Sequence, residues 1–227
     1  MVRGPCGVTG TDVTALQITV TAPVVSFRNP LYAGVQVTLP CPPPATVGGL
    51  LAAAAGGWER VDAELRFAMA FRAGGKAVDF ETYHPLDASG KKTSPTPRNR
   101  EFLTAAELTV WVLDDPEGWR KRLRRPVWPL RLGRSQDLVG IRTELVPLRA
   151  TPGVQGAAVV PESVGRVGTL LRLPTAISAG RDRTRWDGYR FDGSGRADQV
   201  VADSRSTTGG QAVVLLPPTH PDSVSRS

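Results

Sequence analysis

The sequence has few of the residues that build metal centres and disulfide scaffolds. It contains two cysteines, Cys6 and Cys41, and two histidines, His84 and His220. Two cysteines are too few for a Cys-rich zinc module or a disulfide-stapled fold, and two histidines argue against a multi-histidine metal site. We therefore expect neither a metal nor a cofactor.

Long apolar runs are also missing. The longest candidate, residues 47–55, is mostly Gly and Ala and is too short to span a bilayer, which takes about 20 residues. The first ten residues lack the apolar core of a secretory signal. These features predict a cytoplasmic protein that does not interact with a membrane. Hydrophobic residues make up 41% of the 227, which is enough for a packed core and excludes wholesale disorder.

Lysine is scarce, whereas arginine is abundant. Lys and Arg total 28 against 21 Asp and Glu, a net charge of +7, and only four of the cations are Lys. A GC-rich genome would produce the same bias toward Arg. The Arg fork also matches phosphate oxygens in a bidentate manner, so a pI near 10.1 fits a nucleic-acid partner. Both explanations can hold together.

The hydrophobic pattern predicts an α+β fold in the first two thirds of the chain. A helix is expected from an N-cap at Thr46 to the Gly56–Gly57 stop, and another after the Asp115–Pro116 cap. Apolar alternation predicts strands over residues 13–21, 63–71, 102–113 and 128–132, with 78–80 as an antiparallel partner of the second. The resulting βαββαβ order is ferredoxin-like and is shared with RNA-recognition modules. Their aromatic central-strand pattern is missing, so base stacking on the open sheet face is not expected.

Composition divides the chain into three parts. Residues 1–145 should form the ferredoxin-like domain, with a polar, Pro-interrupted loop protruding at about 74–102. Residues 146–216 should form a small β-rich region with strands near 167–173 and 212–216. The tail at 217–227 is expected to be disordered.

Three stretches go beyond composition. They are SFRNPLYAGVQVTLPCPPPATVGGLLAAAAGG at 26–57, TPRNREFL at 96–103 and PLRLGRSQDLVGI at 129–141. Together they resemble the CRISPR-associated protein 5 family of type I interference complexes. That family combines an FR-x-P loop, a Thr-Leu-Pro-x-Pro-Pro segment before a Gly-containing helix, and a later LGR-x-x-D-L-V segment. The likeness covers roughly residues 13–145 and is greatest to the I-B-like branches.

The resemblance implies a RAMP-type ferredoxin-like fold and a binding role in an RNA-guided complex. The protein would bind and cap the 5′ handle of the CRISPR guide RNA (crRNA) in a Cascade-type surveillance complex and help target-DNA interference. Its partners would be the crRNA handle, the backbone (protein 7) subunit and the large subunit, with target DNA reached through the complex.

The candidate RNA-binding residues lie in loops and near a helix start. Cations would hold the phosphates of a single strand, polar side chains would read base edges, and the N–H groups at the helix start would suit a phosphate. The candidates are Arg28, Tyr32, Gln36, Thr46, Gly48, Arg98, Arg100, Arg134, Ser135 and Gln136. Four of them also have a purely structural explanation: a surface ion pair for Arg28, a core position for Tyr32, a cap for Thr46, and a turn fixed through Asp137 for Arg134.

Two other functions stay open. One branch of the family cleaves repeat RNA without a metal, with a Tyr, Lys and His cluster, and Tyr83, His84, Lys91 and Lys92 share one loop here. Such a reaction needs a general base, a general acid and a cation for the phosphorane. No residue near His84 is expected to orient it, so we favour a binding subunit over an endoribonuclease. A generic basic RNA-binding protein is the third alternative.

Overall fold

The computed structural model describes residues 11–32, 36–83, 86, 89–91 and 94–224. These residues form an α+β protein in which antiparallel sheets predominate. The described helices are α1 (Pro44–Ala55), α2 (Pro116–Arg124) and the 3-10 turns η1 (Trp58–Arg60) and η2 (Pro221–Val224). None of them is long and apolar enough to cross a membrane.

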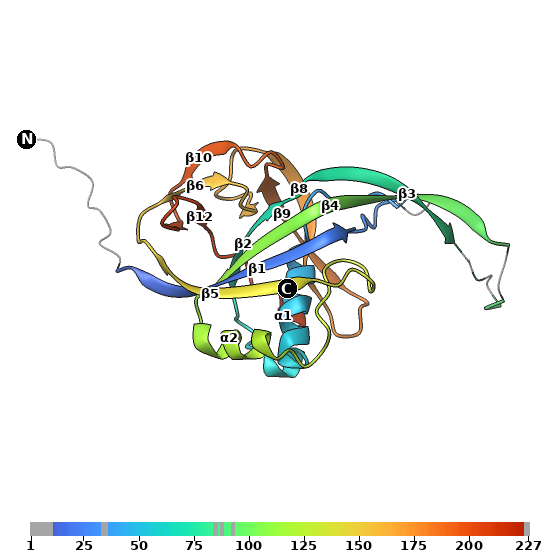
Figure 1. Cartoon of the computed structure of the whole chain (residues 1–227), viewed down its shortest axis with the longest axis horizontal. Helices are drawn as coiled ribbons and strands as arrows, with labels where there is room; N and C mark the ends of the chain where they lie inside the picture. The colour runs from blue at the N-terminus through green and yellow to red at the C-terminus, as the bar shows by residue number, and fades with distance from the viewer. Residues whose placement is uncertain (1–10, 33–35, 84–85, 87–88, 92–93, 225–227) are drawn as a thin grey trace, which may run out of the picture.

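The main sheet is antiparallel and carries both α-helices on one face (Figure 1). Its path runs β2 (Phe67–Arg72), β4 (Thr96–Val112), β1 (Val13–Val25) and β5 (Gly140–Leu148), and β3 (Gly75–Tyr83) pairs with β4 outside that path. The central strand β1 alternates as predicted, because Leu16, Ile18 and Val20 are fully buried under the helices. It is longer than predicted and continues to Val25.

The chain after β5 forms three small sheets. These are β6 (Gly153–Gly156) with β10 (Ala197–Val201), β11 (Arg205–Ser206) with β12 (Ala212–Val213), and β7 (Val160–Pro161), β9 (Thr184–Phe191) and β8 (Thr169–Ile177) in the order β7–β9–β8. Ala157 and Val213 pack on Ala68 and Trp111 of the main sheet. The face of the sheet opposite the helices is therefore partly covered (Figure 1).

Strand β4 has two different partners along its length. Its C-terminal part, from Glu107 to Val112, pairs with β2, and its N-terminal part, from Thr96 to Thr104, pairs with β3. The prediction that 78–80 pairs with the preceding strand is therefore wrong. The change of partner falls at Ala105, whose backbone is left-handed with φ 46°.

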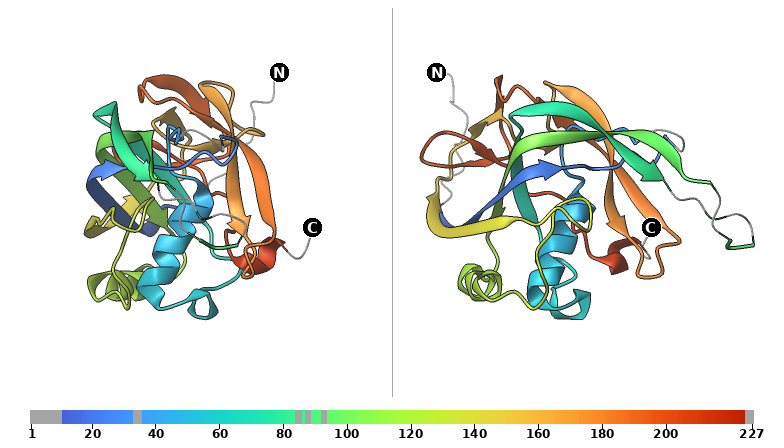
Figure 2. Two further views of the ribbon diagram at one scale, coloured as in Figure 1. Left: turned by 90° about the vertical axis from the view of Figure 1, so that its right-hand side faces the viewer. Right: turned by 45° about the vertical axis from the view of Figure 1, so that its right-hand side comes forward.

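We call β3 and the part of β4 that pairs with it the arm. It projects from the body of the protein, as Figure 1 and the right view of Figure 2 show. The arm begins at residue 75, beside the turn in which Gly74 N–H donates to Thr104 O at 2.8 Å.

The fourth strand of the main sheet is β5, and not residues 128–132 as predicted. Pro126 and Pro129 lack N–H groups, so they cannot donate in a strand ladder. The intervening N–H groups are used elsewhere: Val127 donates to Ala54 O at 3.3 Å and Trp128 to Ala53 O at 3.2 Å. The segment therefore caps the end of α1. With β3 added and the last strand displaced, the predicted βαββαβ order is not reproduced as written.

The two helices follow local signals to different degrees. Helix α2 begins as predicted, because the Asp115 side chain accepts from Gly118 N–H, and it buries Trp119 and Leu123. Helix α1 ends at Gly56 in the left-handed region, as predicted. Its start was predicted wrongly: Pro43 is the N-cap, and Thr46 N–H donates to Pro43 O at 2.9 Å within the first turn.

The C-terminal segment is packed up to Val224, where disorder had been expected. Thr219, Pro221 and Val224 are buried. His220 Nε2 lies 3.1 Å from Trp58 O, and the two rings meet edge to face with centroids 5.4 Å apart. Apolar contacts and these polar contacts hold the segment on η1 and α1.

Candidate nucleic-acid interface

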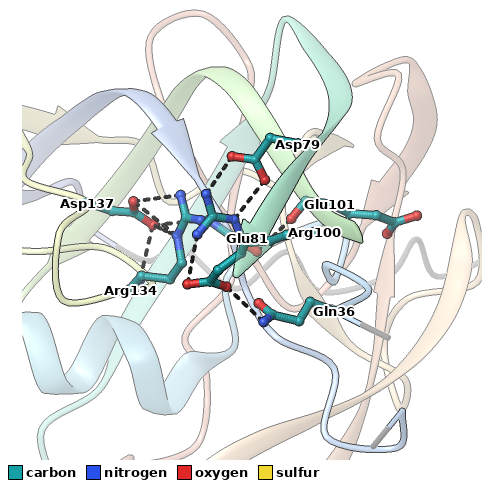
Figure 3. A network of polar contacts seen from close by, with 8 residues as sticks. Gln36, Asp79, Glu81, Arg100, Glu101, Arg134 and Asp137 are labelled. Carbon is teal, nitrogen blue, oxygen red and sulfur yellow. Dashed lines mark hydrogen bonds and ion pairs between the residues drawn. The ribbon is translucent and has the colours of Figure 1, made fainter. Parts of the chain in front are cut away.

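Charged and polar side chains from four distant segments meet at the base of the arm (Figure 3). They come from the loop after β1, from β3, from β4 and from the turn before β5. We call this cluster the arm-base network; it consists of Gln36, Asp79, Glu81, Arg100, Glu101, Arg134 and Asp137.

Arg100 is the central cation of the network. Its Nε donates to Asp79 Oδ1 at 2.9 Å, its Nη2 donates to Asp79 Oδ2, and its Nη1 lies 3.3 Å from Glu81 Oε1. The Arg100 side chain is only 12% exposed. The hydrogen bond from Arg100 lowers the pKa of Asp79, and the same bond raises the pKa of Arg100. Gln36 Nε2 completes the group by donating to Glu81 Oε2 at 2.8 Å.

Glu101 joins the arm to the loop after β1. Its Oε1 is 2.8 Å from Lys76 Nζ, and its Oε2 accepts from Thr38 N–H at 3.0 Å. The hydrogen bond from Lys76 lowers the pKa of Glu101. Along the backbone, Glu101 N–H donates to Gln36 O at 2.9 Å and Ser26 Oγ donates to Glu101 O at 2.8 Å. The loop therefore runs along the edge of β4 as a short parallel bridge.

Asp137 fixes the turn before β5 to the end of β1. Its carboxylate accepts from Arg134 N–H at 3.1 Å, from Arg134 Nε at 3.0 Å and from Ser26 N–H at 3.3 Å. Gly133 allows this approach, because its φ is 98° and an added Cβ would lie 2.6 Å from Ser26 O. The structural role considered for Arg134 is thus formed, and the guanidinium of this residue is already paired.

The predicted RNA-binding residues fall into an inner and an outer group. Gln36, Arg100 and Arg134 belong to the network itself. The outer group is exposed, comes from the same loop, strand and turn as these three residues, and consists of Arg28, Tyr32, Arg98, Ser135 and Gln136. Tyr32 is therefore not a core residue. Within the described part of the chain, no hydrogen bond or ion pair engages the Arg28 side chain.

The two predicted positions on α1 lie apart from the network. Thr46 is half-buried and lines a pocket with Gly133. Gly48 is buried beneath the C-terminal segment, where an added Cβ would lie 2.1 Å from Thr219 Oγ1. Close packing of the Thr219 and Trp58 side chains on the α1 backbone explains glycine at this position.

The network carboxylates of β3 and β4, which are Asp79, Glu81 and Glu101, were not found from the sequence. Asp79 and Glu81 share a face of β3, and Arg98 and Arg100 share the matching face of β4, since Asp79 pairs with Arg100 and Glu81 with Arg98. This charge alternation is readable in the sequence only once β3 is paired with the right strand. For the nuclease alternative, His84, Lys92 and the Tyr83 side chain lie outside the described residues, and Lys91 is exposed.

Comparisons with known proteins agree with the sequence resemblance. The profile of the family described as CRISPR-associated protein (Cas_Cas5) matches residues 15–209, and the chain belongs to this family. A search of curated protein sequences finds no match.

Two solved structures have the same fold. One is a chain of a "CRISPR RNA-guided surveillance complex", with a TM-score of 0.52, 18% identity and 92% of each chain covered. The other is a CRISPR protein from Archaeoglobus fulgidus, with a TM-score of 0.52, 14% identity, and 90% of this chain and 100% of that chain covered.

Proposed function

We propose that this Cas5-family protein is a non-catalytic subunit of a type I surveillance complex that holds the 5′ handle of the crRNA. The observation that carries the proposal is the meeting of all three family-like stretches in the arm-base network. Gln36 comes from the first stretch, Arg100 from the second and Arg134 from the third. The proposal includes the RAMP-type ferredoxin-like assignment, in which β3 is an addition to a βαββαβ core.

The arm-base network and the outer group have different roles in this proposal. Arg100 and Arg134 are neutralised by carboxylates, so they hold the loops in place and contribute little net charge to an RNA strand. The exposed outer group contacts the RNA: Arg28 and Arg98 attract phosphates, Tyr32 offers a ring for stacking, and Ser135 and Gln136 offer polar atoms to bases or sugars. Loops held in place by the network, with the exposed polar side chains of the outer group, suit an RNA single strand of fixed conformation.

The proposed partners follow from the family. They are the backbone (protein 7) subunit, the large subunit and, through the assembled complex, target DNA. The known structure of similar fold described as an RNA-guided surveillance complex supports this assembly as a proposal for the present chain.

Complex assembly tests the RNA-binding role. We expect Arg28→Ala to reduce the yield of crRNA-bound complex while the isolated protein melts normally, since Arg28 is exposed. The matched control is Arg166→Ala, which removes an exposed cation from the C-terminal region. Equal yields for the two variants would contradict the assignment of Arg28 to the RNA.

Maturation of the crRNA tests the non-catalytic role. Metal-free cleavage depends on an oriented general base, so a catalytic His84 could not be replaced without loss of the reaction. We expect His84→Ala to leave repeat-RNA processing unchanged in cells that carry the complete complex. Loss of processing by a variant that still assembles would favour the endoribonuclease alternative.

A further inference from the structure

A pocket of about 450 Å³ lies between α1 and the segment that follows α2. Its floor is the exposed side of α1, and its other wall is the segment that caps the end of this helix. The volume is within the range of small-molecule sites, which is about 300–1,000 Å³. The lining residues are Thr46, Gly49, Leu50, Ala53, Trp128, Pro129, Arg131 and Gly133.

Trp128 is a fixed, exposed aromatic wall of this pocket. Its side chain is in a residue that is 52% exposed, although Trp is usually well buried in folded proteins. Its backbone N–H is held by Ala53 O at 3.2 Å, and the neighbouring Val127 is held by Ala54 O at 3.3 Å. An aromatic ring on a rigid segment can stack on a flat ligand at little cost in ordering.

The charge around Trp128 is positive. Residues 119–134 contain seven Arg and Lys and no Asp or Glu. Arg131 lines the pocket, and Arg125 precedes Trp128 by three residues, as Arg131 follows it by three. Both Arg side chains are exposed, and no hydrogen bond or ion pair engages either of them among the described residues. The lining holds no carboxylate that would repel an anion.

We propose that this pocket binds one unpaired nucleotide of the guide RNA, with the base on Trp128 and the adjacent phosphates on Arg131 and Arg125. The inference rests on the proposed function and adds a second RNA contact, in a pocket whose edge at Gly133 adjoins Arg134 of the arm-base network. A base stacked on an aromatic ring and phosphates on Arg are the usual combination for single strands. Thr46 also lines the pocket, and its hydroxyl would be the group that recognises a ribose 2′-OH.

Gly49 provides a way to close the pocket without disturbing the fold. It lies on the pocket floor, and an added Cβ would have no heavy atom within 4 Å. Gly49→Leu should therefore fill the space meant for the base while the protein still folds. A melt at least as high as that of the unchanged protein checks this point.

The test measures the affinity of the full-length protein for a short oligoadenylate by fluorescence anisotropy. We expect Trp128→Leu and Gly49→Leu each to weaken RNA binding about tenfold, the range for loss of one stacked base. Trp128→Phe keeps an aromatic face and should stay within about threefold. An abasic chain of the same length should bind equally to all these proteins, and Arg131→Ala should weaken both chains.

The outcomes separate this inference from the proposed function. Equal RNA affinity for Trp128→Leu, Trp128→Phe and the unchanged protein would overturn the nucleotide pocket, whatever Arg28→Ala does to complex yield. A Trp128 dependence seen with the deoxy form of the oligonucleotide alone would overturn the assignment to the guide RNA. If Arg28→Ala leaves the complex yield unchanged while Trp128→Leu still weakens RNA binding, the handle contact at the network is wrong and the nucleotide pocket stands.

Discussion

Gly48 of α1 lies directly beneath Thr219 of the C-terminal segment, and an added Cβ would sit 2.1 Å from Thr219 Oγ1. The next residue, Gly49, has open space beside it. A side chain is therefore excluded at Gly48 and has room at Gly49, so the two neighbouring positions can be compared as test and control.

Alanine substitution should have opposite effects at these two positions. Ala is favoured over Gly inside a helix, so Gly49→Ala should raise the free energy of unfolding by about 0.5–1 kcal/mol. Gly48→Ala gains the same propensity but forces the segment off α1, and we expect a net loss of about 1–3 kcal/mol. Urea denaturation of both variants measures the difference. A stabilised Gly48→Ala would show that the segment does not pack on α1 as described.

Asp137 should contribute more to stability than its exposed counterparts. Its side chain is 4% exposed and accepts from Arg134 and from Ser26 N–H. Asp137→Asn leaves the partly buried guanidinium of Arg134 without its counter-charge, which should cost about 3 kcal/mol. Asp203→Asn, at an exposed position, is the control and should change the unfolding free energy by less than about 0.5 kcal/mol. Similar melting temperatures for the two variants would argue against a stabilising role for the Asp137 contacts with Arg134 and Ser26.

The ion pair between Asp79 and Arg100 predicts a pH-dependent effect of Asp79→Asn. Because Arg100 lowers the pKa of Asp79 in the folded state, the stabilisation is present above the ordinary carboxyl pKa of 3.8. It is lost as the pH falls through the lower folded value. We therefore expect Asp79→Asn to melt below the unchanged protein at pH 7 and to converge with it in strong acid.

Melting curves across the acid range check this sign. Asp198→Asn, at an exposed position, should follow the unchanged protein at every pH. An Asp79→Asn difference that is constant with pH would mean that the carboxylate charge is not what stabilises the arm.

Ala105 should tolerate glycine better than its neighbour does. Its φ of 46° lies in the left-handed region, which costs a residue with a Cβ roughly 1–2 kcal/mol. Ala105→Gly relieves this strain and should leave stability equal or higher. Ala106→Gly, at a buried position with ordinary strand geometry, should lower it by about 1 kcal/mol. Equal losses at the two positions would show that the left-handed backbone of Ala105 is not strained.

The salt dependence of RNA binding should report how many phosphates the outer group neutralises. For single strands the slope of log affinity against log salt changes by about 0.7 for each phosphate neutralised. Arg28→Ala should therefore reduce the slope by about 0.7, whereas Arg166→Ala should leave it unchanged. Binding of crRNA recovered from the complex, measured over a salt series, gives both slopes. An unchanged slope for Arg28→Ala would place this cation away from the phosphates.

The features that the sequence predicted correctly depend on interactions between residues close together in the chain. The Asp115–Pro116 cap and the Gly56 stop were identified because each depends on a few consecutive residues. The α+β class and the family followed from periodicity and from three stretches of sequence. The partner of β3 was missed, since pairing with β4 depends on contacts up to 29 residues apart, between Gly75 and Thr104. The ion pairs of Arg100 with Asp79 and Glu81 were missed with it, because they exist only in that register.

The strand at 128–132 was mispredicted for a different reason. Its apolar alternation is real, but Trp128 points outward and the backbone N–H groups cap α1. Apolar alternation indicates that a segment has one apolar face, but it does not show whether the segment pairs with a strand or packs on a helix. Pro126 and Pro129, which lack N–H groups, were the sequence evidence against a strand here.

The position of β1 in the sheet has a consequence for synthesis of the chain. Leu16 pairs with Val112 on one side and with Leu145 on the other, so β1 is an inner strand that is made before both of its partners. At about 5–20 residues per second, the ribosome needs roughly 5–20 s to produce β4 after β1. During this interval Leu16, Ile18 and Val20 have no sheet to join, and non-local pairing of this kind is intrinsically slow. The nascent chain is therefore exposed to aggregation until its middle third has emerged, and chaperone supply during translation should govern its yield.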